Sequence, residues 1–226
     1  MPPVATLKPA AAPRMLRERR CRSGPDYRLR LADGAADVRA AQVLRFLVFN
    51  LELHKGLSQS FATCLDADDF DAVCDHLLVE DRHTGAVVGT YRLQTGPSAR
   101  AHRGYYSARE FDFTPFEAFR PKMLELGRAC IHRDHRAFPV LSLLWRGIAG
   151  YARQHQTRYL IGCSSLPSQD GAVGAATWQH LQPHLAPPAW RTRPMPAYAC
   201  PLQPVAADAP KTPKLLAAYL GLGAMI

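Results

Sequence analysis

An acidic and a basic side chain interrupt an apolar, strand-like run at residues 124–131. Burying an unpaired charge costs several kcal/mol, so Glu125 and Arg128 need partners or a chemical task. Strict strand alternation would place them on opposite faces of a sheet, but Gly127 between them favours a β-bulge that moves the following side chains. Two interpretations follow: a structural ion pair at a strand end, or an active-site strand that carries an acid–base group and a positive anchor.

Length and composition indicate a soluble globular protein of one domain, or of one domain with appendages. The 226 residues are 47% hydrophobic, and no run of about 18 apolar residues predicts a membrane span. The N-terminal residues lack the apolar core of a secretory signal. Six cysteines without a Cys-x-x-Cys pair are typical of buried thiols in a reducing compartment. We therefore expect a cytoplasmic protein that needs neither a disulfide nor a metal for stability.

The net charge is +9, and seven arginines lie between Arg14 and Arg30. Such a surplus predicts an acidic partner: nucleic acid, anionic lipid or an acidic protein. The alternative is a solvated tail in a chain of Arg-rich codon usage. No zinc finger or RNA-binding strand motif is present, which argues against nucleic acid.

Hydrophobic periodicity divides the chain into three parts. Residues 1–25 are rich in Pro, Ala and Arg and are predicted to form a basic, disordered arm; residues 26–170 form the core; and residues 171–226 are a Pro-rich C-terminal segment that completes the domain. The expected core elements are strands at 27–31, 77–80, 86–93, around 125 and 159–163, and helices that begin at Asp37 and Pro139. This order predicts a mixed α/β sheet with a central β-hairpin meander flanked by helices. An acid-bearing strand followed directly by a helix is typical of the GNAT acyltransferase architecture.

The segment from Tyr27 to about Asp170 resembles the ornithine lipid-forming, hemolysin-like N-acyltransferases, which are GNAT-fold relatives of the acyl-homoserine-lactone synthases. The resemblance rests on motifs in the same order along both sequences: Gln42-x-x-Arg45-x-x-x-Phe49, Asp68-x-Phe70-Asp71 followed by residues 74–79, Gly89-Thr90-Tyr91-Arg92-Leu93, Tyr106-Ser107-x-x-Glu110-Phe111-Asp112, Glu125-Leu126-Gly127-Arg128, Leu144-Trp145-x-Gly147-Ile148 and Gly162-Cys163-Ser164-Ser165. Family members usually continue beyond residues 219–224, whereas this chain ends at Ile226, so a truncated C-terminus is one expectation.

The resemblance implies transfer of a fatty, 3-hydroxy acyl chain to the α-amine of an amino acid, first of all ornithine, giving a lyso-ornithine lipid. Glu125 is the first candidate for the general base that deprotonates the amine, and Asp68 and Asp71 are rivals that would otherwise hold the ammonium group. A guanidinium suits a bidentate grip on the substrate carboxylate, and one of the motif arginines is expected to neutralise the acidic loop instead. The substrate-binding candidates are Arg45, Phe49, Arg92, Phe111 and Arg128.

The acyl donor is inferred from the segment 133–138. Members of the architecture that use coenzyme A carry glycines there, which let backbone amides close on a pyrophosphate. Here side chains occupy those positions, and Arg133 and Arg136 are expected to meet the single phosphate of a phosphopantetheine arm. We therefore predict acyl carrier protein as donor, with 4′-phosphopantetheine arriving on that partner and no other cofactor. His132 and His135 are more typical of a surface pair than of metal ligands.

Two other functional interpretations remain open. One is a signal-producing acyltransferase closer to the acyl-homoserine-lactone synthases, although the Trp usual after the Arg-x-x-x-Phe pair is missing here. The other is a non-catalytic basic binding protein on the same scaffold. Because the expected product is a lipid, residence at an anionic inner-membrane surface, assisted by the basic arm, is also expected.

Overall fold

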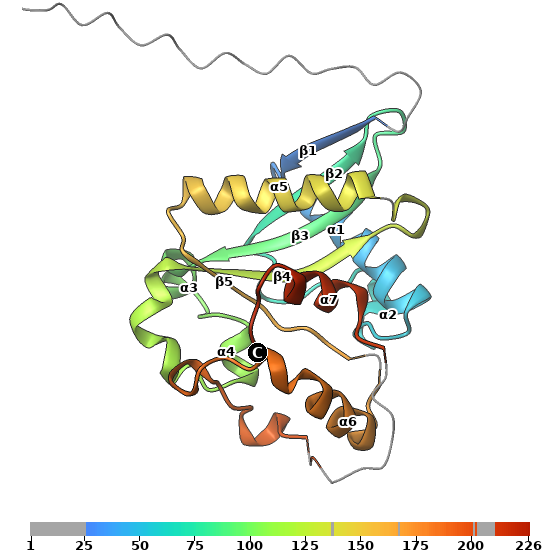
Figure 1. Cartoon of the computed structure of the whole chain (residues 1–226). Helices are drawn as coiled ribbons and strands as arrows, with labels where there is room; N and C mark the ends of the chain where they lie inside the picture. The colour runs from blue at the N-terminus through green and yellow to red at the C-terminus, as the bar shows by residue number, and fades with distance from the viewer. Residues whose placement is uncertain (1–25, 137, 167, 201, 203–210) are drawn as a thin grey trace, which may run out of the picture.

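The computed structural model describes residues 26–136, 138–166, 168–200, 202 and 211–226. The predicted basic arm, residues 1–25, lies outside this described part. The described residues form a sheet with helices on its faces and a C-terminal segment beside it (Figure 1).

The sheet is mixed, as the sequence predicts. Its five strands follow chain order, with three antiparallel pairs from β1 to β4 and a parallel β4–β5 pair: β1 (Tyr27–Leu31), β2 (Asp75–Asp81), β3 (Val87–Thr95), β4 (Met123–Ile131) and β5 (Tyr159–Ile161). The β2–β3 hairpin turns at Gly85, whose φ of +71° is a conformation that favours glycine. Its amide donates to the carbonyl of Asp81 and closes the turn.

Helical segments fill the connections. They are α1 (Ala35–Arg45), the π-helical η1 (Phe46–Glu52), α2 (Ser60–Thr63), α3 (Gly96–Ala101), α4 (Ser107–Glu110), α5 (Phe138–Gln154), α6 (Gly171–Leu181), α7 (Lys214–Gly221) and the 3₁₀ turns η2 (Thr114–Lys122), η3 (Arg133–His135), η4 (Gln182–His184), η5 (Pro188–Trp190) and η6 (Pro196–Tyr198). The prediction that Asp37 caps α1 is wrong. The N-cap is Gly34, and Asp37 pairs with Arg30 of β1 from inside the first turn.

The main core forms between α5 and the sheet. Val140, Leu144 and Ile148 recur at helical spacing on α5, and all three are buried against side chains of β2, β3 and β4. Figure 1 shows α5 lying across one face of the sheet. Gly89 of β3 allows this close packing, because a Cβ there would lie 2.9 Å from a Val140 methyl carbon.

A bulge interrupts β4 next to the interior charges. Thr90 pairs with Cys130 and Arg92 with Gly127, so one β3 residue faces two β4 residues. The bulge expected near Gly127 is therefore confirmed. However, the left-handed residue is Arg128, with φ of +51°, and Gly127 itself has no positive φ. A left-handed conformation costs a non-glycine residue about 1–2 kcal/mol, so interactions of Arg128 must hold it there.

The strands β4 and β5 separate soon after they meet. β5 pairs only with residues 123–125, and Gly162 then packs so closely on β4 that a Cβ would lie 2.4 Å from the carbonyl oxygen of Leu126. The C-terminal helix α7 returns to this region (Figure 1). Its Tyr219 ring stacks on Trp145 of α5, with centroids 5.8 Å apart, and its hydroxyl contacts that of Tyr91 on β3. No helix in the described residues is long and apolar enough to cross a membrane.

Candidate active site

Three aspartates of the acidic loop meet three arginines from the core elements. Arg45, at the end of α1, is fully buried; its Nε lies 3.0 Å from Asp66 Oδ1, and its Nη2 lies 2.5 Å from Asp71 Oδ2. Gln42, one turn earlier on α1, donates to the same Asp71 oxygen, Oδ2, at 3.0 Å. Arg45 was predicted to bind substrate or to neutralise the acidic loop, and these contacts agree with the second alternative.

The other two arginines share one carboxylate. Arg92 of β3 donates through Nη1 to Asp68 Oδ1 at 2.5 Å and to Asp71 Oδ1 at 2.9 Å. Arg128, in the bulge of β4, donates through Nη2 to Asp68 Oδ2 at 2.9 Å. The bulge thus brings Arg128 to the carboxylate that Arg92 also holds. Because the Arg128 side chain keeps 20% of its surface exposed, it is the most accessible arginine of the cluster.

The arginines set the protonation states of this cluster. Burial alone would raise the pKa of Asp68, but Arg92 and Arg128 hold it below its ordinary value. Burial likewise opposes ionisation of Asp71, yet its hydrogen bond with Arg45 and the other nearby donors lower its pKa well below the usual range. Burial lowers the pKa of His76, so this imidazole is neutral at pH 7. Both aspartates are therefore anions at neutral pH and weak proton acceptors.

Glu125 is bound by a different set of donors. Its carboxylate accepts the backbone amides of Tyr106 at 2.8 Å and Ser107 at 2.7 Å, and the Ser107 hydroxyl at 2.5 Å. The Cys163 thiol, just after β5, donates in turn to Ser107 Oγ at 3.4 Å. Glu125 is 6% exposed and fixes the start of α4 against β4. Ser107 thus supplies two of the three hydrogen bonds to the predicted general base.

A buried amide lies next to Glu125 without a hydrogen-bond partner among the described residues. Gln94 of β3 pairs directly with Glu125 across the sheet and is 2% exposed, yet neither its amide nitrogen nor its amide oxygen has a hydrogen-bond partner among the described residues. A Cβ added to Gly127 would meet only Arg92 Nε, at 3.9 Å. Buried polar groups in native proteins are almost always paired, so this amide marks a place for a polar ligand group or water.

The aromatic candidates lie outside this cluster. Phe49 packs on Leu44 and Val48, and Phe111 packs in the cluster around Tyr105 and Phe113. The sequence analysis assigned no role to two residues that do belong to the site. Asp66 is fully buried against Arg45. Phe70 lies under two guanidinium groups, those of Arg92 at 5.5 Å and Arg109 at 4.4 Å from the ring centroid. For Phe70 the available signal was its place in the motif Asp68-x-Phe70-Asp71, and for Asp66 its position two residues before that motif.

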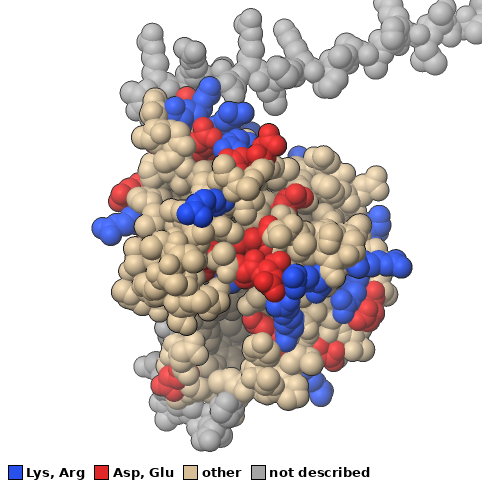
Figure 2. Space-filling model, turned by 180° about the vertical axis from the view of Figure 1, so that it is seen from behind, with Lys and Arg blue, Asp and Glu red and all other residues tan. Residues whose placement is uncertain are grey.

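The expected donor-binding arginines lie in the turn between β4 and α5. Arg133 is largely exposed, 3.8 Å from Asp134. Arg136 donates to Glu52 Oε2 at 2.8 Å and to the carbonyl of Ile131 at 3.1 Å, so part of its charge is already neutralised. Figure 2 shows acidic side chains gathered near the middle of one face of the molecule, with basic side chains directly beside them.

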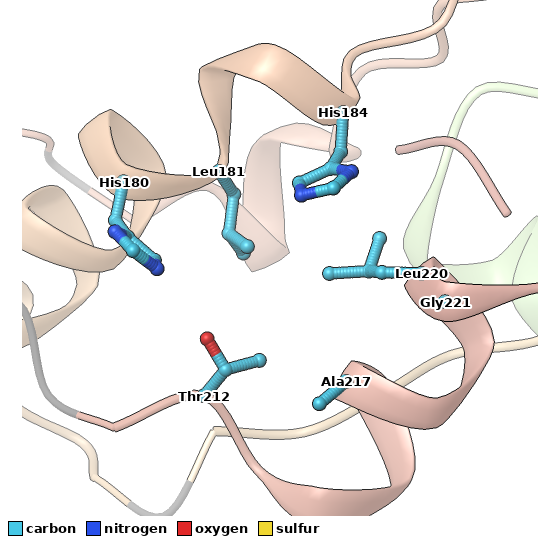
Figure 3. Close-up of a pocket in the computed structure, with 7 residues that line it drawn as sticks. All are labelled: His180, Leu181, His184, Thr212, Ala217, Leu220 and Gly221. Carbon is cyan, nitrogen blue, oxygen red and sulfur yellow. The ribbon is translucent and has the colours of Figure 1, made fainter. Parts of the chain in front are cut away.

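A separate pocket of about 290 Å³ opens between α6 and α7 (Figure 3). Two imidazoles and several apolar side chains point toward it. It shares no residue with the Asp–Arg cluster, and its lining consists of His180, Leu181, His184, Thr212, Ala217, Leu220 and Gly221.

The mixed sheet, the bulged β4 and the separation of β4 from β5 define a GNAT-type acyltransferase, and the family model for the acetyltransferase (GNAT) domain matches residues 44–146. More particularly, the chain belongs to the L-ornithine N(alpha)-acyltransferase family. It is 37% identical over 216 residues to the protein of that name from Brucella abortus (strain 2308), covering 88% of this chain and 76% of the relative. It is 35% identical over 215 residues to that of Rhodobacter capsulatus, covering 88% and 82%.

Solved structures with similar folds include the acyl-homoserine-lactone synthase LasI, at 18% identity and a TM-score of 0.43, which covers 62% of this chain and 72% of that one. FeeM, an N-acyl amino acid synthase from uncultured soil microbes, aligns at 16% identity and a TM-score of 0.45, covering 62% and 71%.

Proposed function

We propose that this protein moves a fatty, 3-hydroxy acyl chain from acyl carrier protein to the α-amine of ornithine, giving a lyso-ornithine lipid. The observation that carries the proposal is the likeness of 33–37% over 87–88% of the chain to four proteins named L-ornithine N(alpha)-acyltransferase. The cluster of paired charges beside the bulged strand β4 supports the same reaction.

The proposed chemistry is attack of the amine on a thioester, and it requires loss of a proton from the amine nitrogen. The carboxylate of Glu125 is the proposed final acceptor. Because three donors occupy its lone pairs, we assign the proton transfer to a relay: the Ser107 hydroxyl receives the proton from the amine and passes its own to Glu125. Asp68 and Asp71 are weaker candidates, since their arginine partners lower their pKa values.

The substrate carboxylate is assigned to Arg128. Its guanidinium retains exposed surface, and the neighbouring Gly127 leaves room for a ligand beside Arg92. Arg45 has no exposed surface and serves instead to hold Asp66 and Asp71. Asp71 in turn pairs with Arg92 at 2.9 Å, and Asp66 lies 3.6 Å from Arg128.

The choice of donor rests on the turn before α5. It lacks the glycines of a pyrophosphate cradle, and Arg133 is free to meet a single phosphate at the surface. A net charge of +9 favours an acidic carrier protein over a neutral partner and is also compatible with peripheral binding to an anionic membrane from the cytoplasmic side.

The decisive experiment supplies the purified full chain with 3-hydroxyacyl carrier protein and, in parallel, with the same acyl group on coenzyme A. Ornithine, lysine, glutamine, glycine and norvaline serve as acceptors, and mass spectrometry detects N-acyl products. The proposal expects ornithine and the carrier protein to give the highest kcat/KM. Preferred acylation of glycine or glutamine, or no N-acyl product at all, would refute it.

A further inference from the structure

One carboxylate of the site has neither a cation nor a full set of donors. The three aspartates of the acidic loop are matched by Arg45, Arg92 and Arg128. Glu125 is satisfied by amides and a hydroxyl. Glu110, the last residue of α4, forms no ion pair with a basic side chain in the part of the chain that the structure describes, although it is partly buried.

Glu110 lies beside the groups that surround the reacting strand. α4 is a single turn, so Glu110 follows Ser107, the partner of Glu125, at a spacing that places both on one side of the helix. Burial, followed by the Glu110 carboxylate, raises the pKa of Tyr106 to about 12, and the charge of Arg128 opposes that rise. The Tyr106 ring also lies 5.9 Å from the Arg92 guanidinium and packs on Phe70 with centroids 5.5 Å apart, so it borders the Asp–Arg cluster.

Cys163, two residues after the end of β5, lies against α4. Desolvation is the main cause that raises the pKa of the Cys163 thiol to about 12; the hydrogen bond with Ser107 opposes this rise, and the carboxylates of Glu110 and Glu125 add to it. Its hydrogen bond to Ser107 Oγ at 3.4 Å fixes where this thiol lies. Ser107 and Glu110 of α4 thus lie beside Glu125, Arg128 follows three residues after Glu125 on β4, and no basic side chain among the described residues forms an ion pair with Glu110.

We propose that the Glu110 carboxylate binds the side-chain ammonium of the acceptor and makes the site selective for a diamino acid. The assignment rests on the proposed function and specifies its acceptor. In this proposal Arg128 binds the carboxylate of the amino acid, and the α-amine lies near Ser107. The side chain of the amino acid then points toward Glu110. A partly buried carboxylate that lacks a cationic partner stabilises a cation there more strongly than a carboxylate in water does.

The test compares ornithine with norvaline, which has the same carbon chain and lacks the terminal amine. We expect Glu110→Gln to lower kcat/KM for ornithine roughly 10–100-fold, the effect of losing a charged hydrogen-bond partner, and to change kcat/KM for norvaline less than about threefold. Gln keeps the size and an acceptor oxygen for Tyr106. The matched control is Glu117→Gln, an exposed residue paired with Arg120, which should change neither value.

Each outcome separates this assignment from the wider proposal. A wild-type protein that acylates neither acceptor refutes the proposed function and this assignment with it. A working wild type whose Gln variant loses both acceptors equally, or neither, overturns the role of Glu110 alone. If the Gln variant is unstable, Glu110→Asp keeps the charge and shortens its reach by one methylene group, so lysine should gain on ornithine; an unchanged ratio of lysine to ornithine would also overturn the assignment.

Discussion

Replacing Glu125 by Gln tests both chemistry and architecture. One carboxylate oxygen accepts the Ser107 amide and hydroxyl, and the other accepts the Tyr106 amide. A Gln side chain has only one acceptor oxygen, so its NH₂ group must face a buried N–H donor. Leaving such a donor unpaired costs about 1–3 kcal/mol of folding free energy, and loss of a positioned base lowers turnover by about 10²–10⁴. We expect Glu125→Gln to show both effects.

Ser107→Ala separates the two effects. It removes the hydroxyl of the proposed relay and leaves both backbone amides bound to Glu125. Its loss of folding free energy should stay near 1 kcal/mol by urea unfolding, while kcat falls about 10²-fold or more with KM for ornithine little changed. Near-normal kcat in Ser107→Ala would refute the relay, and near-normal kcat in a folded Glu125→Gln would remove Glu125 as the base.

The remaining predictions concern the charged cluster and the donor. Arg45→Met leaves buried carboxylates unpaired and should lower the free energy of unfolding, measured in urea, by about 3–5 kcal/mol. A loss below about 1 kcal/mol would show that the acidic loop does not depend on Arg45. Asp68 and Asp71 have lowered pKa values in the folded state. Their contribution to folding stability should therefore be complete above the ordinary carboxyl pKa of about 4 and should fall as the pH drops below it. Urea unfolding midpoints measured between pH 7 and 3 will show this decrease. Arg133→Ala with Arg136→Ala should raise KM for acyl carrier protein several-fold at low salt without a similar change for ornithine; equal use of acyl-coenzyme A would contradict the donor argument.

Local sequence patterns predicted the features of the fold that depend on short-range chemistry. A glycine between two charges in an apolar run indicated the β4 bulge, and the Pro139 region with its 3.6-residue period indicated α5. The pattern did not reveal that Arg128 adopts the left-handed conformation. Glycine has the lower intrinsic cost, but the interaction of Arg128 with Asp68, some 60 residues earlier, determines the outcome.

The C-terminal helices were not predicted, for a different reason. α6 is rich in Ala and Gly and has a weak apolar stripe, although Asp170 accepts the amide of Ala172 and is a recognisable N-cap. α7 spans eight residues after a proline, too short for its period to be distinguished from chance. Its position depends on Tyr219 reaching Tyr91 and Trp145, which are contacts between distant parts of the chain.

The division of charge within this molecule links its architecture to the proposed reaction. The chain as a whole has a surplus of nine positive charges, whereas the site pairs three aspartates with three arginines and adds Glu110 and Glu125. A carrier protein approaching the surface meets a positive field that salt screens over about 8–10 Å. A diamino acid entering the site meets a net negative, partly buried environment that salt screens much less. Recruitment of an acidic donor and selection of a cationic acceptor therefore depend on different charges and can vary independently.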